Sequence, residues 1–398
     1  MKKIYLSVLG MYLGMIGAFA QNSTDTAAYK PRKLKLEEVN FVSAYYHQDG
    51  SHSAVTGGEG TEKLSDVATT IELKLLKYDR HDRRHNWAFE LGVDHYTSAS
   101  SDNIDPYQVT SPSYSDNRIY PSLSWNVQNE KRGFAFGLNA SFSNEYDYNS
   151  LGAGVNVTQT SKDRNREFTA KLQGFFDSWK VILPIELRGA TGAPGTKIGS
   201  HEPRRSYSAS FSLSQVVNEQ LQVLVLAEPT YQEGLLATKY QRVYFAGTAV
   251  GVEELPGSRL KLPLGLRANY FWGDRFILRS FYRYYLDDWG VRAHTAELEL
   301  PVKLTSFVSL SPFYRFYSQT AADYFAPKYA HRITEAFFTS DYDLSQVNSN
   351  FFGTGLRLSP PKGVFGINRW NSLELRYGHY RRSDGLQSDI LSLSAKFK

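Results

Sequence analysis

The chain has 398 residues, carries a net charge of +5 and contains no cysteine. The absence of cysteine excludes a disulfide framework, a thiolate nucleophile and a cysteine zinc site. Beyond the N-terminus no apolar run approaches the ~18 residues of a membrane helix, which excludes a helical membrane protein. No run of lysine and arginine is long enough to indicate a nucleic-acid partner.

The first twenty residues have the pattern of a signal peptide. A short basic head precedes a nearly continuous apolar stretch over residues 4–19. This stretch ends in the small-x-small site that signal peptidase reads, with Ala20 as its last residue. We therefore predict a signal peptide over residues 1–20, cleaved after Ala20, and a flexible periplasmic tail over residues 21–32.

From residue 33 onward, almost every segment alternates apolar and polar side chains for about ten residues at a time. Residues 67–75 and residues 391–398 show the alternation most clearly. The period of 3.6 that a helix requires appears in no long segment. Alternation predicts strands with one apolar face, which fits a soluble β-sandwich or propeller as well as a membrane barrel.

Three further features favour a transmembrane barrel. The expected strands are about 10–14 residues long, which is the reach of a tilted membrane strand. Short turns alternate with long polar loops, as periplasmic turns and extracellular loops do in such barrels. The chain also ends on an amphipathic strand with a near-terminal aromatic residue, Phe397, and barrel-insertion machinery reads strands of this kind.

We therefore predict an all-β fold, a single transmembrane antiparallel up-and-down barrel over residues 33–398. It should have about 16 strands, or 14 if the less regular segments 151–160 and 221–227 are not strands. Long extracellular loops are expected near residues 48–63, 98–116, 177–205, 232–259 and 320–348.

Tryptophan and tyrosine gather near the ends of the expected strands. The tryptophans among them are Trp87, Trp125, Trp179, Trp272, Trp289 and Trp370. Such residues can form a sugar-stacking surface or the interfacial girdles of a membrane barrel. Because the positions follow strand ends and not one cluster, we favour the girdles.

A stretch in the C-terminal third is more specific than the alternation. Its characteristic residues are Asp288, Trp289, Gly290, His294, Ala321, Ala322, Asp323 and Tyr324. With segments 233–236 and 254–259, it resembles a family of Bacteroidota-type outer-membrane proteins of unknown function, the domain-of-unknown-function 3570 family. The resemblance covers about residues 230–325. It implies an outer-membrane β-barrel and supplies no activity.

The same region predicts a polar network inside the barrel. Three strands around residues 281, 297 and 313 carry polar side chains opposite their apolar faces. A charged side chain that faces lipid costs about 2–4 kcal/mol near the midplane, so these side chains should point into the lumen. The network comprises Arg279, Arg283, Tyr285, Asp287, Thr295, Glu297, Arg315, Tyr317 and Gln319. It either braces the wall or selects anionic solutes, and mutual pairing of Arg283 and Arg315 with Glu297 favours bracing.

The patterns for catalysis and metal binding are weak. His294 next to Thr295 is a candidate for nucleophilic chemistry, but nothing fixes a partner for it. His81 and His85 flank two arginines, which is more typical of a solvated turn than of a metal site. Segments 101–105 and 341–343 offer oxygen ligands for Ca²⁺ without the usual glycine and terminal glutamate. We predict no enzymatic activity, no metal and no cofactor.

Two functional classes remain. One is a channel or transporter for small hydrophilic solutes, with a lumen wide enough for water at this strand number. The other is a loop-plugged barrel that anchors or assists periplasmic or surface partner proteins. In both cases we expect location in the outer membrane of a Gram-negative bacterium. The expected partners are membrane lipids, lipopolysaccharide and the barrel-insertion machinery, with no nucleic acid.

Overall fold

The computed structural model describes residues 33–97, 115–188 and 199–398. The predicted signal peptide, the predicted tail and the 101–105 segment lie outside the described residues. The described ranges contain strands and four short 3-10 turns, η1 to η4, at Ala54–Thr56, Ile185–Leu187, Tyr342–Leu344 and Val364–Gly366. No helix in these ranges is long and apolar enough to cross a membrane.

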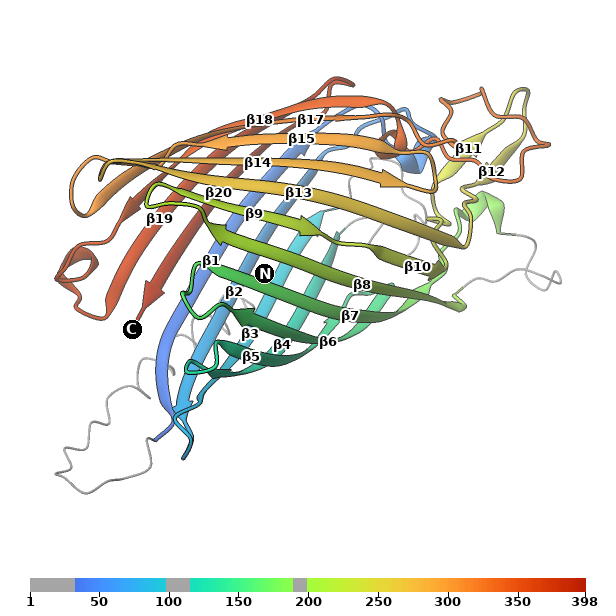
Figure 1. Ribbon diagram of the computed structural model, residues 1–398. Helices are drawn as coiled ribbons and strands as arrows, with labels where there is room; N and C mark the ends of the chain where they lie inside the picture. Colours follow the sequence, from blue (N-terminus) through green and yellow to red (C-terminus); the bar gives the residue numbers. More distant parts are fainter. Residues whose placement is uncertain (1–32, 98–114, 189–198) are drawn as a thin grey trace.

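Sixteen antiparallel strands close into one barrel (Figure 1). In chain order they are β1 (Lys35–Asp49), β2 (Leu64–Tyr78), β3 (Arg84–Thr97), β4 (Ser115–Asn129), β5 (Phe134–Asn144), β6 (Tyr148–Thr160), β7 (Arg166–Lys180), β8 (His201–Val216), β9 (Leu221–Ala227) with β10 (Thr230–Gly234), β13 (Ser258–Trp272), β14 (Phe276–Asp287), β15 (Arg292–Glu299) with β16 (Val302–Lys303), β17 (Val308–Gln319), β18 (Val347–Leu358), β19 (Trp370–Arg382) and β20 (Gln387–Phe397). The pairs β9–β10 and β15–β16 are single strands with a short break, since both parts pair with the same neighbours. Pairing of β1 with β20 closes the barrel. The predicted 16-strand barrel is confirmed, including both less regular segments.

The connections differ in length between the two ends of the barrel. At the short-turn end, most connections have three to five residues, and residues 359–369 form the longest. At the long-loop end, residues 50–63, 181–200, 235–257 and 320–346 form long connections. Four of the five expected long loops are therefore confirmed, and most of the fifth, near residues 98–116, lies outside the described residues. Residues 145–147, 288–291 and 383–386 are short connections at the same end.

The two faces of the wall differ in polarity. The outer face exposes large apolar side chains, among them Leu123, Leu172, Leu266, Leu298 and Leu391. The inner face is polar: Glu299 of β15 and Arg376 of β19 form an ion pair at 2.9 Å, although β17 and β18 separate their strands. Such a pair forms across the inside of a curved wall. The apolar outer face is the surface that a bilayer requires.

The six tryptophans occupy three kinds of position. Four of them share the outer face near the short-turn end: Trp87, Trp125, Trp272 and Trp370. Trp370 stacks on Phe397, with ring centroids 5.5 Å apart, as part of an aromatic girdle. Trp289 differs, because it is buried in a hydrophobic core with Ala237 and Leu255 at the long-loop end. Trp179 of β7 lies on the inner face, with its ring 4.8 Å from that of Tyr148 and 5.1 Å from the Arg204 guanidinium. The assignment of Trp179 and Trp289 to a girdle is wrong.

Candidate functional site

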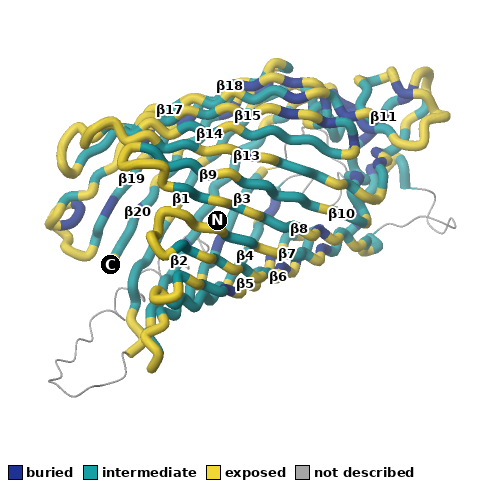
Figure 2. The backbone as a smooth tube through the Cα atoms, viewed as in Figure 1, coloured by how far each residue is buried: buried dark blue, intermediate teal, exposed yellow. Residues whose placement is uncertain are grey.

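Four loops at the long-loop end pack into a unit that we call the cap, residues 50–63, 181–188, 235–257 and 320–346. The hairpin of β11 (Arg242–Tyr244) and β12 (Val250–Val252) belongs to it. Isolated bridges join the third loop to the fourth, at Phe245 with His331 and at Glu254 with Phe338. Buried residues gather at this end of the molecule (Figure 2). The cap therefore has a folded core of its own.

Arg242 joins three of the four cap loops. Its guanidinium forms a bidentate ion pair with Glu186 and donates to the carbonyl oxygen of Val55 at 3.0 Å. The loops that carry Glu186 and Val55 leave the rim six strands apart. Because Arg242 is buried, these charge-assisted hydrogen bonds form with little water nearby. Arg242 thus connects loops from distant parts of the rim across the mouth of the barrel.

Glu253 is a carboxylate buried inside the cap, 2% exposed. It accepts hydrogen bonds of 2.5 Å from the hydroxyl of Thr339 and from the backbone N–H of Thr238. Burial, followed by the nearby Asp341 carboxylate, raises the pKa of Glu253 to about 7. Burial and Asp343 likewise raise the pKa of Asp341. The cap therefore contains carboxyl groups that change charge closer to neutral pH than ordinary carboxyl groups do.

The residues of the family resemblance come together where the cap meets the rim. The Trp289 indole donates to a carbonyl at the start of β13, and the Arg259 guanidinium lies 4.2 Å from its ring centroid. Asp323 donates its backbone N–H to the Trp289 carbonyl at 2.9 Å, and Tyr324 packs edge-on against the indole. Gly290 has a φ of +85°, and the Asp323 carboxylate occupies the space of a Cβ there. These residues form a seat for the cap.

The rest of the motif is divided between this seat and the outer face. Asp288 accepts a hydrogen bond from a β13 backbone N–H at 3.0 Å. Ala322 is buried and donates its N–H to a cap carbonyl at 2.8 Å, directly after the half-buried Ala321. His294 lies apart on the outer face, 2.7 Å from the Tyr282 hydroxyl. The motif is therefore mainly structural.

The predicted lumenal network is divided by depth. Near the rim, Asp287 accepts hydrogen bonds from Arg259 at 2.9 Å, from Tyr285 at 2.7 Å and from two backbone N–H groups of the next turn. Gln319 accepts from the Tyr317 hydroxyl and donates to two cap carbonyls at 2.9 and 2.6 Å. These four predicted residues hold the rim and the cap together.

Deeper in the barrel, the predicted ion pairs are not formed. Glu297 lies opposite Arg315 in the register of β15 and β17, and Thr295 lies opposite Arg283. Within the described residues, neither arginine hydrogen-bonds to Glu297. Arg315 lies over the Phe351 ring at 4.8 Å, and the Arg283 Nε is buried without a partner. The structure brings the residues into neighbouring positions but leaves their charges unpaired.

Charged side chains of the inner wall toward the short-turn end reach water. Arg279 and Arg376 share Glu299, each at 2.9 Å, and their side chains are 50% and 36% exposed. Lys396 pairs with Glu38 at 2.9 Å and is 39% exposed. Ion pairs of this kind are hydrated and not sealed in a packed interior. This part of the lumen is therefore polar and accessible to solvent.

The lumen keeps open space beneath the cap. A cavity of about 550 Å³ lies between barrel residues such as Tyr46 and Arg315 and cap residues such as Tyr240 and Asp341. A second cavity, of about 480 Å³, lies against β4 to β8 and reaches Glu90 on β3. The cap therefore covers the mouth without filling the space below it.

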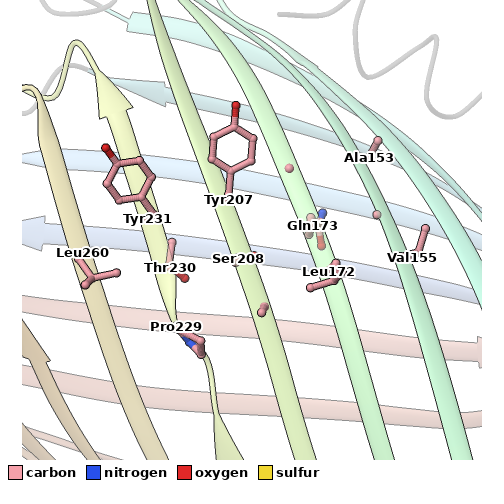
Figure 3. Close-up of a pocket in the computed structure, with 13 residues that line it drawn as sticks. Ala153, Val155, Leu172, Gln173, Tyr207, Ser208, Pro229, Thr230, Tyr231 and Leu260 are labelled. Atoms are coloured by element: carbon pink, nitrogen blue, oxygen red, sulfur yellow. The ribbon is translucent and has the colours of Figure 1, made fainter.

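The outer wall has a groove of about 570 Å³ over β6, β7, β8 and β10 (Figure 3). Tyr207 and Tyr231, register partners on β8 and β10, flank it. Small residues, including Ala153 and Gly174, form part of its lining. The groove is apolar and belongs to the membrane-facing surface, not to the lumen.

The candidate catalytic pair cannot act together. His294 lies on the outer face, while Thr295 is buried in the wall on the lumenal side. Consecutive residues of a strand point to opposite faces. Of the two turn histidines, His85 contacts Asp79 at 3.3 Å and accepts from the Trp125 indole at 3.2 Å, while the backbone N–H of His81 donates to Asp79 at 2.8 Å. His294 and Thr295 are therefore adjacent in the sequence but do not form a nucleophile and its base.

Acidic residues that could hold a cation lie near the mouth. Asp341 accepts from the N–H of Asp343 at 2.9 Å, and Asp343 pairs with Arg382, so the predicted 341–343 segment binds other parts of the protein. A cluster that the sequence did not indicate comprises Asp116, Glu145 and Asp147, whose carboxylate oxygens lie within 4.8 Å of one another. The Tyr96 hydroxyl donates to Glu145 at 2.6 Å.

The residues that build the cap carry no local pattern that predicts them from the sequence. Arg242, Glu253 and Thr339 lie in long loops without periodicity, where single residues carry no pattern. One usable signal is composition: these loops contain apolar residues such as Val243 and Phe338, which exposed polar loops do not need. Apolar residues in a long loop indicate a buried loop core.

Residues 94–385 match the family described as Protein of unknown function (DUF3570). This range is more than half of the chain. The chain belongs to this family. The family resemblance expected from residues 230–325 is therefore confirmed, and the DUF3570 region extends from β3 to the turn between β19 and β20. A search of curated proteins found no match.

Solved structures similar to this DUF3570 protein include a bacterial polysaccharide outer membrane secretin, with 10% identity and a TM-score of 0.44 over 90% of this chain and 98% of the other. A BenF-like porin from Pseudomonas fluorescens Pf-5 has 7% identity and a TM-score of 0.44 over 90% and 98%. OccK9 (OpdG) from Pseudomonas aeruginosa has 9% identity and a TM-score of 0.43 over 92% and 98%.

Proposed function

We propose that this protein is an outer-membrane channel or transporter for small hydrophilic solutes and not an enzyme. The observation that carries the proposal is the solvent exposure of charged side chains on the inner wall toward the short-turn end, namely Arg279, Arg376 and Lys396. Hydrated charges on the inner wall, together with open space beneath the cap, favour the passage of polar solutes.

A second candidate function is a loop-plugged barrel that serves as an anchor or accessory subunit for periplasmic or surface proteins. The cap favours this candidate, because Arg242 and Glu253 bind loops to one another across the mouth. A stable cap would restrict entry and would present a folded surface to a partner.

The proposed location brings its own partners. Lipids and lipopolysaccharide would cover the apolar outer face, and barrel-insertion machinery would engage β20, which ends at Phe397. Delivery to a Gram-negative outer membrane would require the signal peptide, cleaved after Ala20. A periplasmic partner protein belongs to the second candidate function.

Conductance of the purified barrel in planar bilayers tests the choice. A channel should give step-like conductance, either in the wild type or, if the cap closes the mouth, in Arg242→Ala. Arg205→Ala is the matched control, because it removes a largely exposed ion pair with Glu233 and should behave like the wild type. Silence of both the wild type and Arg242→Ala, with barrels that remain folded, would favour the anchor.

A further inference from the structure

β2 and β3 present acidic side chains to the lumen. Their inward positions carry Asp66, Glu72, Glu90 and Asp94, with Lys74 as a cation among them. We call this surface the acidic wall. Glu72 and Glu90 are direct register partners, and like charges opposite each other destabilise a sheet. Within the described part of the chain, Glu90 has no hydrogen-bond or ion-pair partner. Strand pairing alone does not account for this arrangement.

β13 and β14 present basic side chains to the lumen. Their inward positions carry Arg259, Lys261, Arg267, Arg279 and Arg283, which we call the basic wall, together with one carboxylate, Asp287, which pairs with Arg259. Arg267 lies opposite Phe281, so Arg279 and Arg283 are its diagonal neighbours. The Arg267 guanidinium contacts the Phe281 ring at 5.5 Å, and no carboxylate of the described residues pairs with it. Positive charge is therefore concentrated here without full compensation.

The order of strands places these two walls opposite each other. Eight strand steps lead from β2 to β13, and eight lead from β3 to β14. In a closed barrel of sixteen strands, eight steps are half of the circumference. Glu72 and Glu90 lie in the middle of their strands, as do Arg267 and Arg283. Glu72 pairs with Lys74 at 3.2 Å, whereas Glu90 and Arg267 have no charged partner among the described residues. An unpaired negative charge and an unpaired positive charge therefore lie on opposite walls of the lumen.

We propose that the two walls create an electric field across the lumen, and that the channel favours zwitterionic solutes. This inference rests on the proposed channel function. A zwitterion can turn its anionic group toward the basic wall and its cationic group toward the acidic wall, so it is attracted at both. An ion of one sign is attracted by one wall and repelled by the other. An uncharged solute of the same size gains neither attraction.

Osmotic swelling of proteoliposomes measures this preference directly. Glycylglycine is a zwitterion at neutral pH, and N-acetylglycinamide is an uncharged molecule of similar size. Both have no net charge, so neither creates a membrane potential as it enters. We expect swelling at least about threefold faster in glycylglycine at low ionic strength. At ~1 M salt the Debye length falls to about 3 Å, and the ratio of the two swelling rates should approach one.

Variants separate the field from the channel itself. Glu90→Gln and Arg267→Gln each remove one unpaired charge and should each lower the glycylglycine preference. Arg267 is exposed and contacts a ring only at its guanidinium, so its replacement should leave the barrel folded. Lys171→Gln is the matched control, since Lys171 is an exposed inward cation on β7, away from both walls. The ratio of the swelling rates in glycylglycine and N-acetylglycinamide should stay at the wild-type value in this variant.

Two results overturn the proposal in distinguishable ways. Equal swelling in the two solutes, or an equal loss of preference in Lys171→Gln, would refute the field and leave the channel intact. No swelling in either solute, with the wild type and with Arg242→Ala alike, would refute the channel and, with it, the preference that depends on it.

Discussion

Replacement of Arg242 by alanine should loosen the cap without unfolding the barrel. The change removes two hydrogen bonds to Glu186 and one to the Val55 carbonyl. Hydrogen bonds to charged groups contribute about 1.5–3 kcal/mol each. Glu186 is 47% exposed, so solvent already weakens its pair and will hydrate it in the variant. We expect a loss of roughly 2–4 kcal/mol in the free energy of cap opening, which raises the open fraction roughly 30- to 900-fold.

Hydrogen exchange followed by mass spectrometry measures this opening. Peptides that contain Val243 and Thr339, both fully buried in the cap, should exchange faster in Arg242→Ala, while barrel strands keep their protection. Arg205→Ala is the control, because an exposed pair contributes less than about 1 kcal/mol. Unchanged protection of the cap peptides would refute the role of Arg242. Equal loss of protection in the strands would show that the cap does not open as a separate unit.

Four further predictions test the cap, the orientation, the location and the wall. The folded cap raises the pKa of Glu253 from 4.5 to about 7, so the contribution of this group to cap stability is complete below pH 4.5 and declines as the pH rises to 7. Hydrogen exchange of the cap amides, corrected for the intrinsic rate, should therefore be faster at pH 8 than at pH 5. Glu253→Gln should make this exchange less dependent on pH. In a chain without native cysteine, Ile333→Cys in the cap, 73% exposed, should react with an impermeant thiol reagent on whole cells, while Lys131→Cys in a short turn should not; the reverse pattern would invert the orientation. The protein should fractionate with the outer membrane and change its gel mobility on boiling, and recovery as a soluble periplasmic protein would contradict the barrel in a membrane. Gly378→Ala should lower the free energy of unfolding by about 1–3 kcal/mol, because its Cβ would lie 2.6 Å from an aromatic ring on β18, whereas Gly174→Ala, with neighbours at 3.6 Å or more, should change it little in a thermal melt.

The barrel could be predicted from the sequence because a membrane wall repeats one physical requirement at every second residue. Leu298 must meet lipid and Glu297 must not, so the order of residues specifies the face. The same alternation predicts that Arg283 and Arg315 point inward. It cannot say which charges meet, because partners are set by curvature: Glu299 pairs with Arg376 from a strand that is not its neighbour.

The cap could not be predicted in this way. Arg242 contacts residues 56 and 187 positions away along the chain, and no local pattern encodes such contacts. Residue type misleads here as well. Trp272 is exposed on the outer face and Trp289 is buried under loops, although both lie at or near the end of a strand. The surroundings that decide their roles come from other parts of the chain.

The contacts of Arg242 also constrain the order of folding. Bringing together segments 187 residues apart carries a large cost in chain entropy unless the intervening strands are already paired. The loops that carry Val55, Glu186 and Arg242 are held near one another only by a wall that curves round on itself. We therefore expect the cap to form late, after β1 has paired with β20, so that the folding barrel passes through a stage in which its mouth is uncovered. In a refolding time course, the buried cap amides should accordingly become protected from hydrogen exchange only after the barrel wall has closed.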